Sequence, residues 1–162
     1  MTISTGDRLP EANLVRLGAE GPEQVSVKDL TAGRKVIIFA VPGAFTKTCH
    51  VAHVPSFIRQ KEALLAKGVE EIICVSVNDP FVMQAWGEAT EADKAGITML
   101  SDGTGAFTAA LGMAFDAPAV GLMGRSKRYA MLVEDGVIKV LNLEENPGTV
   151  ERSGGEAMLA AI

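Results

Sequence analysis

Two short apolar runs most constrain what this chain can fold into. They occupy positions 36–41 (Val-Ile-Ile-Phe-Ala-Val) and 72–77 (Ile-Ile-Cys-Val-Ser-Val). Strands that are apolar on both faces are typical of the interior of a parallel sheet, where helices cover both sides. The stretch 48–67 between them carries apolar residues at helical spacing, and Gly68 follows it as a helix-ending residue would. Strand, helix and strand in this order predict a right-handed βαβ crossover.

Other elements are expected on either side of this crossover. Pro55 lies inside the first helix and should kink it, because proline removes one backbone donor. Asp79 and Pro80 begin a second helix, which extends to about residue 88 or 92. Asp135-Gly136 between two apolar runs indicates a hairpin. The remaining expected elements are a strand at 98–100, a short helix at 103–111, hairpin strands at 127–133 and 137–143, a closing helix at 156–162, and an opening hairpin at 13–17 and 24–27.

These elements predict a single α/β domain over residues 1–162, with a central mixed β-sheet flanked by helices. The net charge of the chain limits the kinds of partner that we expect. It carries 15 Lys and Arg against 20 Asp and Glu, which gives a net charge of -5. Nucleic-acid binders usually carry a basic surplus, so neither nucleic acid nor an anionic membrane is an expected partner. The N-terminus lacks a signal-peptide pattern. Two cysteines fit a reducing compartment, so we expect a cytoplasmic protein.

The segment 41–53, Val-Pro-Gly-Ala-Phe-Thr-Lys-Thr-Cys-His-Val-Ala-His, follows the first buried strand and opens the helix. Open α/β sheets place ligands beyond the carboxyl ends of their strands. Cys49 falls in the first turn of this helix, where unpaired N–H groups and the helix dipole favour the thiolate over the thiol. The thiolate is the reactive form, so the position predicts an activated nucleophile. The alternative is a small buried core residue, which most free cysteines are.

Thr46 lies three residues before Cys49, where a dithiol oxidoreductase would carry the first cysteine of its Cys-x-x-Cys pair. A hydroxyl there forms no local disulfide, but it can donate a hydrogen bond to a thiolate or to a bound oxygen substrate. Threonine also favours the N-cap of a helix, and the two roles are compatible.

At this point the sequence resembles a known family. The segment is similar to the peroxiredoxin motif Pro-x-x-x-Thr-x-x-Cys, with Pro42, Thr46 and Cys49 in the motif positions. The longer string that ends in Cys-x-x-x-His-x-Pro resembles the type II, or peroxiredoxin-five-like, subfamily. The resemblance runs from about Gly6 to the C-terminus. It includes Cys-Val-Ser-Val-Asn-Asp at 74–79, Trp-Gly at 86–87, Asp-Gly-Thr-Gly-Ala-Phe at 102–107 and Lys-Arg-Tyr-Ala-Met at 127–131.

The resemblance implies a thioredoxin-like fold and an enzyme that reduces hydrogen peroxide and alkyl hydroperoxides, without a cofactor. Cys49 would be the peroxidatic cysteine, which becomes a sulfenic acid. Thr46 would donate to the thiolate and the peroxide, and Pro42 would shield the sulfur from bulk water. Arg128 would reach the thiolate and the peroxide with an always-charged guanidinium. Arg125 is the second choice for that role, and a solvated surface charge is the alternative for either arginine.

The sequence leaves the reductant of the oxidised cysteine open. Some type II members carry a resolving cysteine near the C-terminus, but residues 148–153 here contain none. The resolving thiol is therefore Cys74 or an outside thiol. Cys74 lies in a predicted central strand, where a packing role is the safer interpretation. Resemblance to members without the C-terminal cysteine favours glutathione, with or without glutaredoxin, and thioredoxin is the alternative. The resemblance also implies a homodimer.

Histidines and aromatic residues near the motif have simpler interpretations. Cys49 and His53 are four residues apart, as metal ligands can be, but the chain offers too few further donors, so no metal site is expected. His53 should instead pack beside Cys49. Trp86, Phe81 and Phe45 are most simply core residues, and interface anchors are the alternative.

Two other classes of function compete with the peroxidase. A non-catalytic redox sensor or partner-binding module would be switched by oxidation of Cys49, and it would not need Thr46 or Arg128. A disulfide oxidoreductase of the thioredoxin kind would need the missing Cys-x-x-Cys pair.

Overall fold

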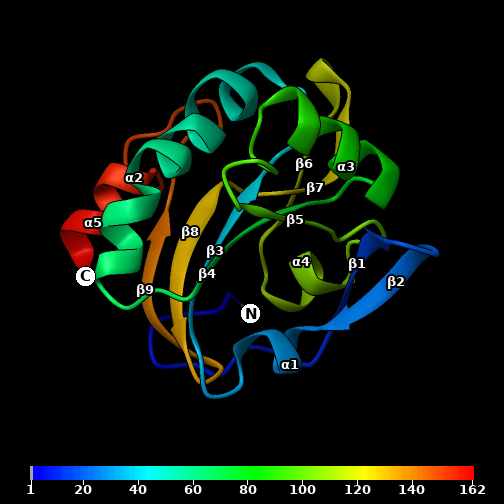
Figure 1. Ribbon diagram of the computed structural model, residues 1–162. Helices are drawn as coiled ribbons and strands as arrows, with labels where there is room; N and C mark the ends of the chain where they lie inside the picture. Colours follow the sequence, from blue (N-terminus) through cyan, green and yellow to red (C-terminus); the bar gives the residue numbers. More distant parts are fainter. Residues whose placement is uncertain (1) are drawn as a thin grey trace.

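The computed structural model describes residues 2–162 and confirms a mixed α/β architecture (Figure 1). Its strands are β1 (Asn13–Gly18), β2 (Gly21–Ser26), β3 (Lys35–Val41), β4 (Glu71–Ser76), β5 (Thr98–Ser101), β6 (Ala114–Ala117), β7 (Leu122–Ser126), β8 (Tyr129–Glu134) and β9 (Val137–Leu143). Its helices are α1 (Val27–Thr31), α2 (Val54–Ala66), α3 (Pro80–Ala89), α4 (Ala106–Ala110) and α5 (Gly155–Ala161), with a π-helical turn η1 (Cys49–His53) and a 3-10 turn η2 (Pro118–Val120). Within residues 2–162, every helix is too short or too polar to cross a membrane.

Seven strands form one central sheet in the order β2-β1-β5-β4-β3-β8-β9, and β6 pairs with β7 in a separate ribbon. The predicted βαβ crossover is confirmed, because β3 and β4 are parallel neighbours joined through α2. β5 continues the parallel part, whereas β1 and β8 are antiparallel to their neighbours β5 and β3. The sheet is therefore mixed, as predicted, with its parallel strands in the centre.

Helices cover both faces of the sheet, as the two apolar runs predicted. Along β3, the buried residues at even positions 36–40 belong to one apolar cluster and those at odd positions 37–41 to another. The first cluster includes side chains of α1 and α4, and the second includes side chains of α2, α3 and α5. Figure 1 shows α2, α3 and α5 on a different side of the sheet from α1 and α4. This two-sided burial explains why both central strands are almost wholly apolar.

The predicted hairpin between β8 and β9 is confirmed. Asp135 and Gly136 form its turn, with positive φ angles of 48° and 77°. Both central residues of a type I′ turn need positive φ, which glycine and aspartate tolerate better than most residues. The Asp135 carboxylate also accepts a hydrogen bond of 2.7 Å from the Gly33 N–H, which fastens the turn to the loop before β3.

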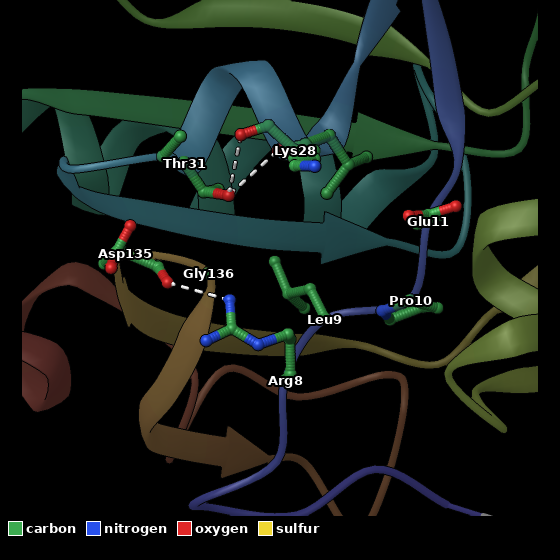
Figure 2. Close-up of a pocket in the computed structure, with 10 residues that line it drawn as sticks. Arg8, Leu9, Pro10, Glu11, Lys28, Thr31, Asp135 and Gly136 are labelled. Atoms are coloured by element: carbon green, nitrogen blue, oxygen red, sulfur yellow. Dashed lines mark hydrogen bonds between the residues drawn. The ribbon is translucent and has the colours of Figure 1, made fainter.

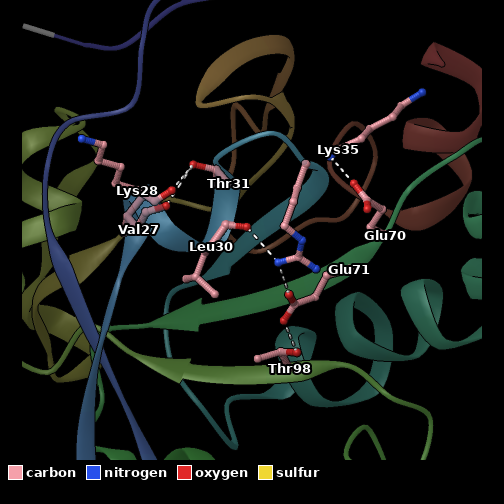
Figure 3. Close-up of polar contacts among 9 residues, drawn as sticks. Val27, Lys28, Leu30, Thr31, Lys35, Glu70, Glu71 and Thr98 are labelled. Carbon is pink, nitrogen blue, oxygen red and sulfur yellow. Dashed lines mark hydrogen bonds and ion pairs between the residues drawn. The ribbon is translucent and has the colours of Figure 1, made fainter.

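A chain of polar contacts joins the starting ends of the central strands (Figure 3). Arg34 donates hydrogen bonds of 2.9 Å to the carbonyl of Leu30 and to the Glu71 carboxylate. That carboxylate also accepts a 2.6 Å bond from the Thr98 hydroxyl. The side chains lie before β3, on β4 and on β5, so they close the end of the sheet opposite to the one from which the Cys49 segment leaves.

The helix that follows β3 differs from the prediction in its first turns. Cys49 begins the π-helical turn η1, in which the Val54 N–H bonds the carbonyl of Cys49, five residues back. Pro55 lies in the first turn of α2, where a missing N–H has little cost, and not in the middle of a continuous helix. The expected kink is therefore a change from π to α geometry just before Pro55. Such π-turns occur often at functional sites.

Candidate active site

Cys49 lies beyond the carboxyl end of β3, at the first residue of η1, as the sequence predicts. Its side chain is fully buried, and both cysteines are free thiols. It belongs to the apolar cluster on the α2 side of the sheet. Burial in an apolar cluster strengthens every electrostatic contact that the sulfur makes, so its polar neighbours decide its chemistry.

The Thr46 hydroxyl is the first of these neighbours. Its oxygen is 2.9 Å from Sγ of Cys49 and 2.7 Å from the carbonyl oxygen of Gly43. The loop residue therefore directs its hydroxyl at the sulfur, as the motif spacing led us to expect. The carbonyl of Thr46 accepts a 3.0 Å bond from the His50 N–H, so its backbone also joins the start of the helix.

Arg128 is the second polar neighbour, and it is only 2% exposed. Its Nη2 donates to Sγ of Cys49 over 3.1 Å, its Nη1 is 2.9 Å from Nδ1 of His53, and its Nε donates to the carbonyl of Pro147 over 2.9 Å. Three N–H directions of one planar group are thereby held by two segments, since Cys49 and His53 both belong to η1 and Pro147 lies in the loop after β9. The surface-charge alternative for Arg128 is wrong, because the guanidinium is buried against the sulfur.

His53 holds Arg128 in place as a neutral ring. Its Nε2 is 2.9 Å from the carbonyl oxygen of Ser153, which only a protonated nitrogen can approach as a donor. Nδ1 is then the unprotonated nitrogen and accepts from Arg128. Burial, reinforced by the charge of Arg128, lowers the pKa of His53 to about 3, although the bond to Ser153 and the charge of Glu144 oppose this shift.

The prediction that His53 packs beside Cys49 therefore extends to a bonding role through Arg128. Both of its ring nitrogens already have hydrogen-bond partners. Within residues 2–162, no group of three or more His, Cys, Asp or Glu side chains is arranged to hold a metal ion.

Arg125 contacts the loop of the site and not its sulfur. Its Nη1 donates to the carbonyl of Pro42 over 3.2 Å, from β7. A Cβ added at Gly43 would lie 2.6 Å from the same Nη1, so glycine permits this approach. The structure thus brings Arg128, and not Arg125, to Cys49. Pro42 is buried in this loop, and its shielding of the sulfur stays a prediction.

Cys74 is fully buried in β4, at the centre of the sheet. It pairs in register with Phe39 on β3 and Met99 on β5. Burial raises the pKa of the Cys74 thiol well above its ordinary value, and the nearby Cys49 adds to this effect while Arg128 opposes it. A protonated, buried thiol is a poor nucleophile. The packing role predicted for Cys74 accords with this position.

Of the three aromatic residues that the sequence assigns to the core near the motif, one is buried and two are exposed. Trp86 is fully buried, as predicted, and its Nε1 donates to Nδ1 of His50 over 3.0 Å. The core prediction is wrong for Phe45 and Phe81, which are 52% and 61% exposed. Phe45 lies in the loop with a positive φ of 63° and stacks on the His50 ring, which turns it away from the core.

Two pockets lie at opposite ends of the β8–β9 hairpin. One of about 330 Å³ is lined by Arg8, Leu9, Val27 and Lys28 among others, near the hairpin turn at Gly136, and Figure 2 shows Arg8 bonded to the Asp135 carbonyl there. It contains none of the residues around Cys49. Another, of about 420 Å³, is lined by Arg128 with Phe115, Lys127, Glu144, Pro147 and Arg152. Only the second adjoins the site.

The arrangement suits nucleophilic chemistry at sulfur. Two donors, Thr46 and Arg128, point at one buried sulfur, and one of them carries a permanent positive charge. Both stabilise a thiolate, and both stand where a second electronegative atom beside the sulfur would also meet them. Sequence reasoning found these two residues, but it missed that His50, beside Cys49, accepts the Trp86 N–H.

Comparisons with known proteins point to one family. A family model described as Redoxin matches residues 4–159. The chain is 51% identical over 165 residues to peroxiredoxin-2E-2, chloroplastic, of Oryza sativa subsp. japonica, which covers 99% of this chain and 73% of that protein. It is 47% identical over 161 residues to peroxiredoxin-2C of the same species, covering 99% and 98%.

Solved structures give the same picture. The chain is similar to reduced Prx3 from Vibrio vulnificus in complex with hydrogen peroxide, with a TM-score of 0.92, 49% identity and 99% coverage of both chains. It is also similar to peroxiredoxin 5 from Alvinella pompejana, with a TM-score of 0.84, 33% identity and coverage of 98% and 97%. Every residue of the site described above lies within residues 4–159, the range that the Redoxin model matches.

Proposed function

This chain belongs to the redoxin family as a type II peroxiredoxin, a thiol peroxidase, and we propose that Cys49 is its peroxidatic cysteine, with Thr46 and Arg128 as the donors that activate it. One observation carries this assignment: the two donors lie 2.9 Å and 3.1 Å from the same buried sulfur. A non-catalytic sensor needs only an oxidisable thiol, whereas paired donors serve a transition state in which charge moves from sulfur to a leaving oxygen.

The reaction follows from these contacts. The Cys49 thiolate attacks the nearer oxygen of the peroxide, an S–O bond forms, and the O–O bond breaks. Sulfur is oxidised to a sulfenic acid, and the leaving oxygen takes up a proton and departs as water or an alcohol. Arg128 and Thr46 stabilise the negative charge as it moves onto the leaving oxygen. Binding of hydrogen peroxide by the similar Prx3 of Vibrio vulnificus supports a peroxide substrate of the same kind.

An external thiol, glutathione with or without glutaredoxin, regenerates Cys49 in this proposal. Support comes from Cys74, because its thiol is fully buried in the apolar cluster over β4 and is held in the protonated form. Further support comes from the pocket beside Arg128, where Lys127 offers positive charge to a carboxylate of such a thiol, whereas Arg152 there is already paired with Glu145. Thioredoxin is the alternative reductant. Two free cysteines also fit a cytoplasmic, reducing location.

The decisive experiment is intact mass after one equivalent of hydrogen peroxide, with and without glutathione. Wild type, Cys74→Ser and Cys49→Ser are compared. We expect a glutathione adduct on Cys49 in both the wild type and Cys74→Ser, and no adduct in Cys49→Ser. Loss of two hydrogens in wild type alone, without an adduct, would show a Cys49–Cys74 disulfide and overturn the reductant. Unchanged mass in folded wild type would overturn the assignment of Cys49.

A homodimer is the second part of the proposal. Four large apolar side chains, Phe45, Phe81, Val120 and Met123, are 52%, 61%, 73% and 60% exposed. The segments that carry them are tied to one loop: Ala44 N–H donates to Asn78 before α3, and Arg125 on β7 donates to Pro42. Exposed apolar side chains gathered around a site are typical of a protein interface.

Sedimentation equilibrium tests the dimer. The wild type is expected to be a dimer, and Phe81→Asp is expected to be a monomer because it places a charge among the exposed apolar side chains. Leu65→Asp, an exposed apolar residue on α2, is the matched control and should remain dimeric. A monomeric wild type at high concentration would overturn this part of the proposal.

A further inference from the structure

Glu144 is a carboxylate buried directly after β9, with the residue only 6% exposed. Its Oε2 accepts from the Ser153 N–H at 2.7 Å, from the Ser153 hydroxyl at 2.6 Å and from the Arg152 N–H at 2.8 Å. Its Oε1 accepts from the Glu151 N–H at 3.1 Å. Three successive backbone N–H groups therefore converge on one side chain, which organises residues 145–153 around it.

The carboxylate of Glu144 is held in its charged form. Burial raises the pKa of Glu144, but the bonds from Ser153, Arg152 and Glu151 outweigh that effect and leave it below its ordinary value. A buried carboxylate is tolerated only when its oxygens are hydrogen-bonded, and donation from backbone N–H groups to a charged acceptor is strong. Removing the charge therefore frees the segment that it organises.

Residues 145–153 also contact the residues around Cys49 through their backbone carbonyls. The carbonyl of Pro147 accepts from Nε of Arg128, and the carbonyl of Ser153 accepts from His53. The carbonyl of Gly148 accepts a 3.0 Å bond from the Thr48 hydroxyl, next to Cys49. Each contact uses a backbone carbonyl, so its position depends on the conformation of the segment and not on the side chains at these positions.

We infer that Glu144 is a positioning residue for the peroxidatic site: by shaping residues 145–153, it places the Pro147 and Ser153 carbonyls that aim Arg128 at Cys49. Glu144 touches neither the sulfur nor the peroxide, so its effect on reactivity passes through Arg128. This inference rests on the proposed role of Arg128. The experiments below distinguish a wrong role for Glu144 from a wrong role for Arg128.

Glu144→Gln tests the inference, because it keeps the shape of the side chain but replaces one acceptor oxygen with an N–H₂ donor that faces backbone donors. The rate constant with hydrogen peroxide should fall roughly tenfold to a hundredfold, the range that misplacement of a reacting group costs. The pH midpoint of Cys49 alkylation by iodoacetamide should rise, and a purely structural role would leave this midpoint in place. All measurements use the Cys74→Ser background, in which Cys49 is the one thiol that can be oxidised or alkylated.

Two further variants serve as controls. Glu145→Gln changes the next residue, whose side chain is 79% exposed and pairs with Arg152, and it should react like the wild type. Glu144→Asp keeps the charge on a shorter side chain and should fall between the wild type and Glu144→Gln. If Glu144→Gln does not fold, as judged by near-UV circular dichroism, Glu144→Asp carries the same test.

The final arm repeats the Glu144 substitution in Arg128→Gln protein. If Glu144 acts through Arg128, the second substitution adds less than about a twofold loss, because coupled residues are not additive. An equal loss in both backgrounds, or a Glu144→Gln protein with wild-type rate and alkylation midpoint, overturns the inference. An Arg128→Gln protein that reacts with hydrogen peroxide at the wild-type rate overturns the proposed role of Arg128 itself. This result does not depend on any Glu144 variant.

Discussion

The Thr46 hydroxyl and the Cys49 sulfur lie 2.9 Å apart, and Thr46 has a single proton with two acceptors in reach. The second acceptor is the Gly43 carbonyl, 2.7 Å from the same oxygen. When Cys49 is a thiol, its S–H can donate to Thr46 while Thr46 donates to Gly43. When Cys49 is a thiolate, the Thr46 proton turns to the sulfur. The orientation of this hydroxyl therefore follows the charge of the sulfur.

Replacing the hydroxyl should slow peroxide reduction. Thr46→Val keeps the shape of the side chain but removes the donor, so the rate constant with hydrogen peroxide should fall about 10²- to 10³-fold, as loss of one transition-state donor does in other enzymes. Thr46→Ser keeps the hydroxyl and should retain most of the rate. Stopped-flow kinetics on both variants check this, and equal rates for Val and Ser would show that the hydroxyl has no part in the reaction.

His53 should make the fold sensitive to mild acid. Its pKa of about 3 in the folded protein lies below the ordinary value of 6.5, so between these values the unfolded chain binds a proton that the folded protein does not. Stability is therefore complete above about pH 6.5 and decreases as the pH falls, by about 2 kcal/mol between pH 7 and pH 5.

Urea unfolding at pH 7 and pH 5 measures this loss. His53→Gln should be less stable at pH 7, because it replaces a ring bonded to Arg128 and Ser153. Its free energy of unfolding should nevertheless change little between the two pH values. A wild-type pH dependence that persists in His53→Gln would assign the effect to other groups.

Trp86 should report oxidation of Cys49 by fluorescence. It is the only tryptophan of the chain, and its indole N–H donates to His50, the residue next to Cys49. Any movement of η1 on sulfenic acid formation changes that bond and hence the environment of the indole. We expect a change in emission on addition of hydrogen peroxide in wild type and none in Cys49→Ser. An unchanged wild-type spectrum, with oxidation verified by mass, would show that η1 stays in place.

Gly155 should tolerate no side chain. A Cβ there would lie 2.5 Å from the carbonyl oxygen of Ser56 and 3.2 Å from Cα of Phe57, both backbone atoms of α2. Gly155→Ala must push α5 away from α2, so it should destabilise the fold by about 1 to 3 kcal/mol. Ala160→Ser, on the exposed side of α5, is the control and should change stability little. Thermal unfolding compares the two variants.

The fold was predictable where the sequence pattern had one interpretation. β3, β4 and the β8–β9 hairpin carried long apolar runs or an Asp-Gly turn, and each forms where it was expected. α1 was missed because five residues are too few for a periodic pattern, although Ser26 caps it through the Asp29 N–H. The β6–β7 ribbon was missed because its residues are mostly small or exposed, and it pairs with a shift in register.

The site was predictable at its motif and not around it. Thr46 and Arg128 could be named because their residue types suit the chemistry of Cys49. The carbonyls of Pro147 and Ser153 could not, because a backbone contact leaves no mark on residue type. Phe45 and Phe81 were assigned to the core on hydrophobicity alone, which does not separate an interior residue from an exposed one at an interface.

Burial of both thiols in the same apolar cluster has a kinetic consequence. Neither sulfur can meet a partner until some packing is released, so regeneration of the enzyme begins with a local opening. An outside thiol requires only the short η1 turn to yield, whereas an internal disulfide also requires the packing of helical side chains over Cys74 on β4 to open. The reductant is then selected by which opening is faster, and temperature or denaturant would shift the competition by favouring the larger one.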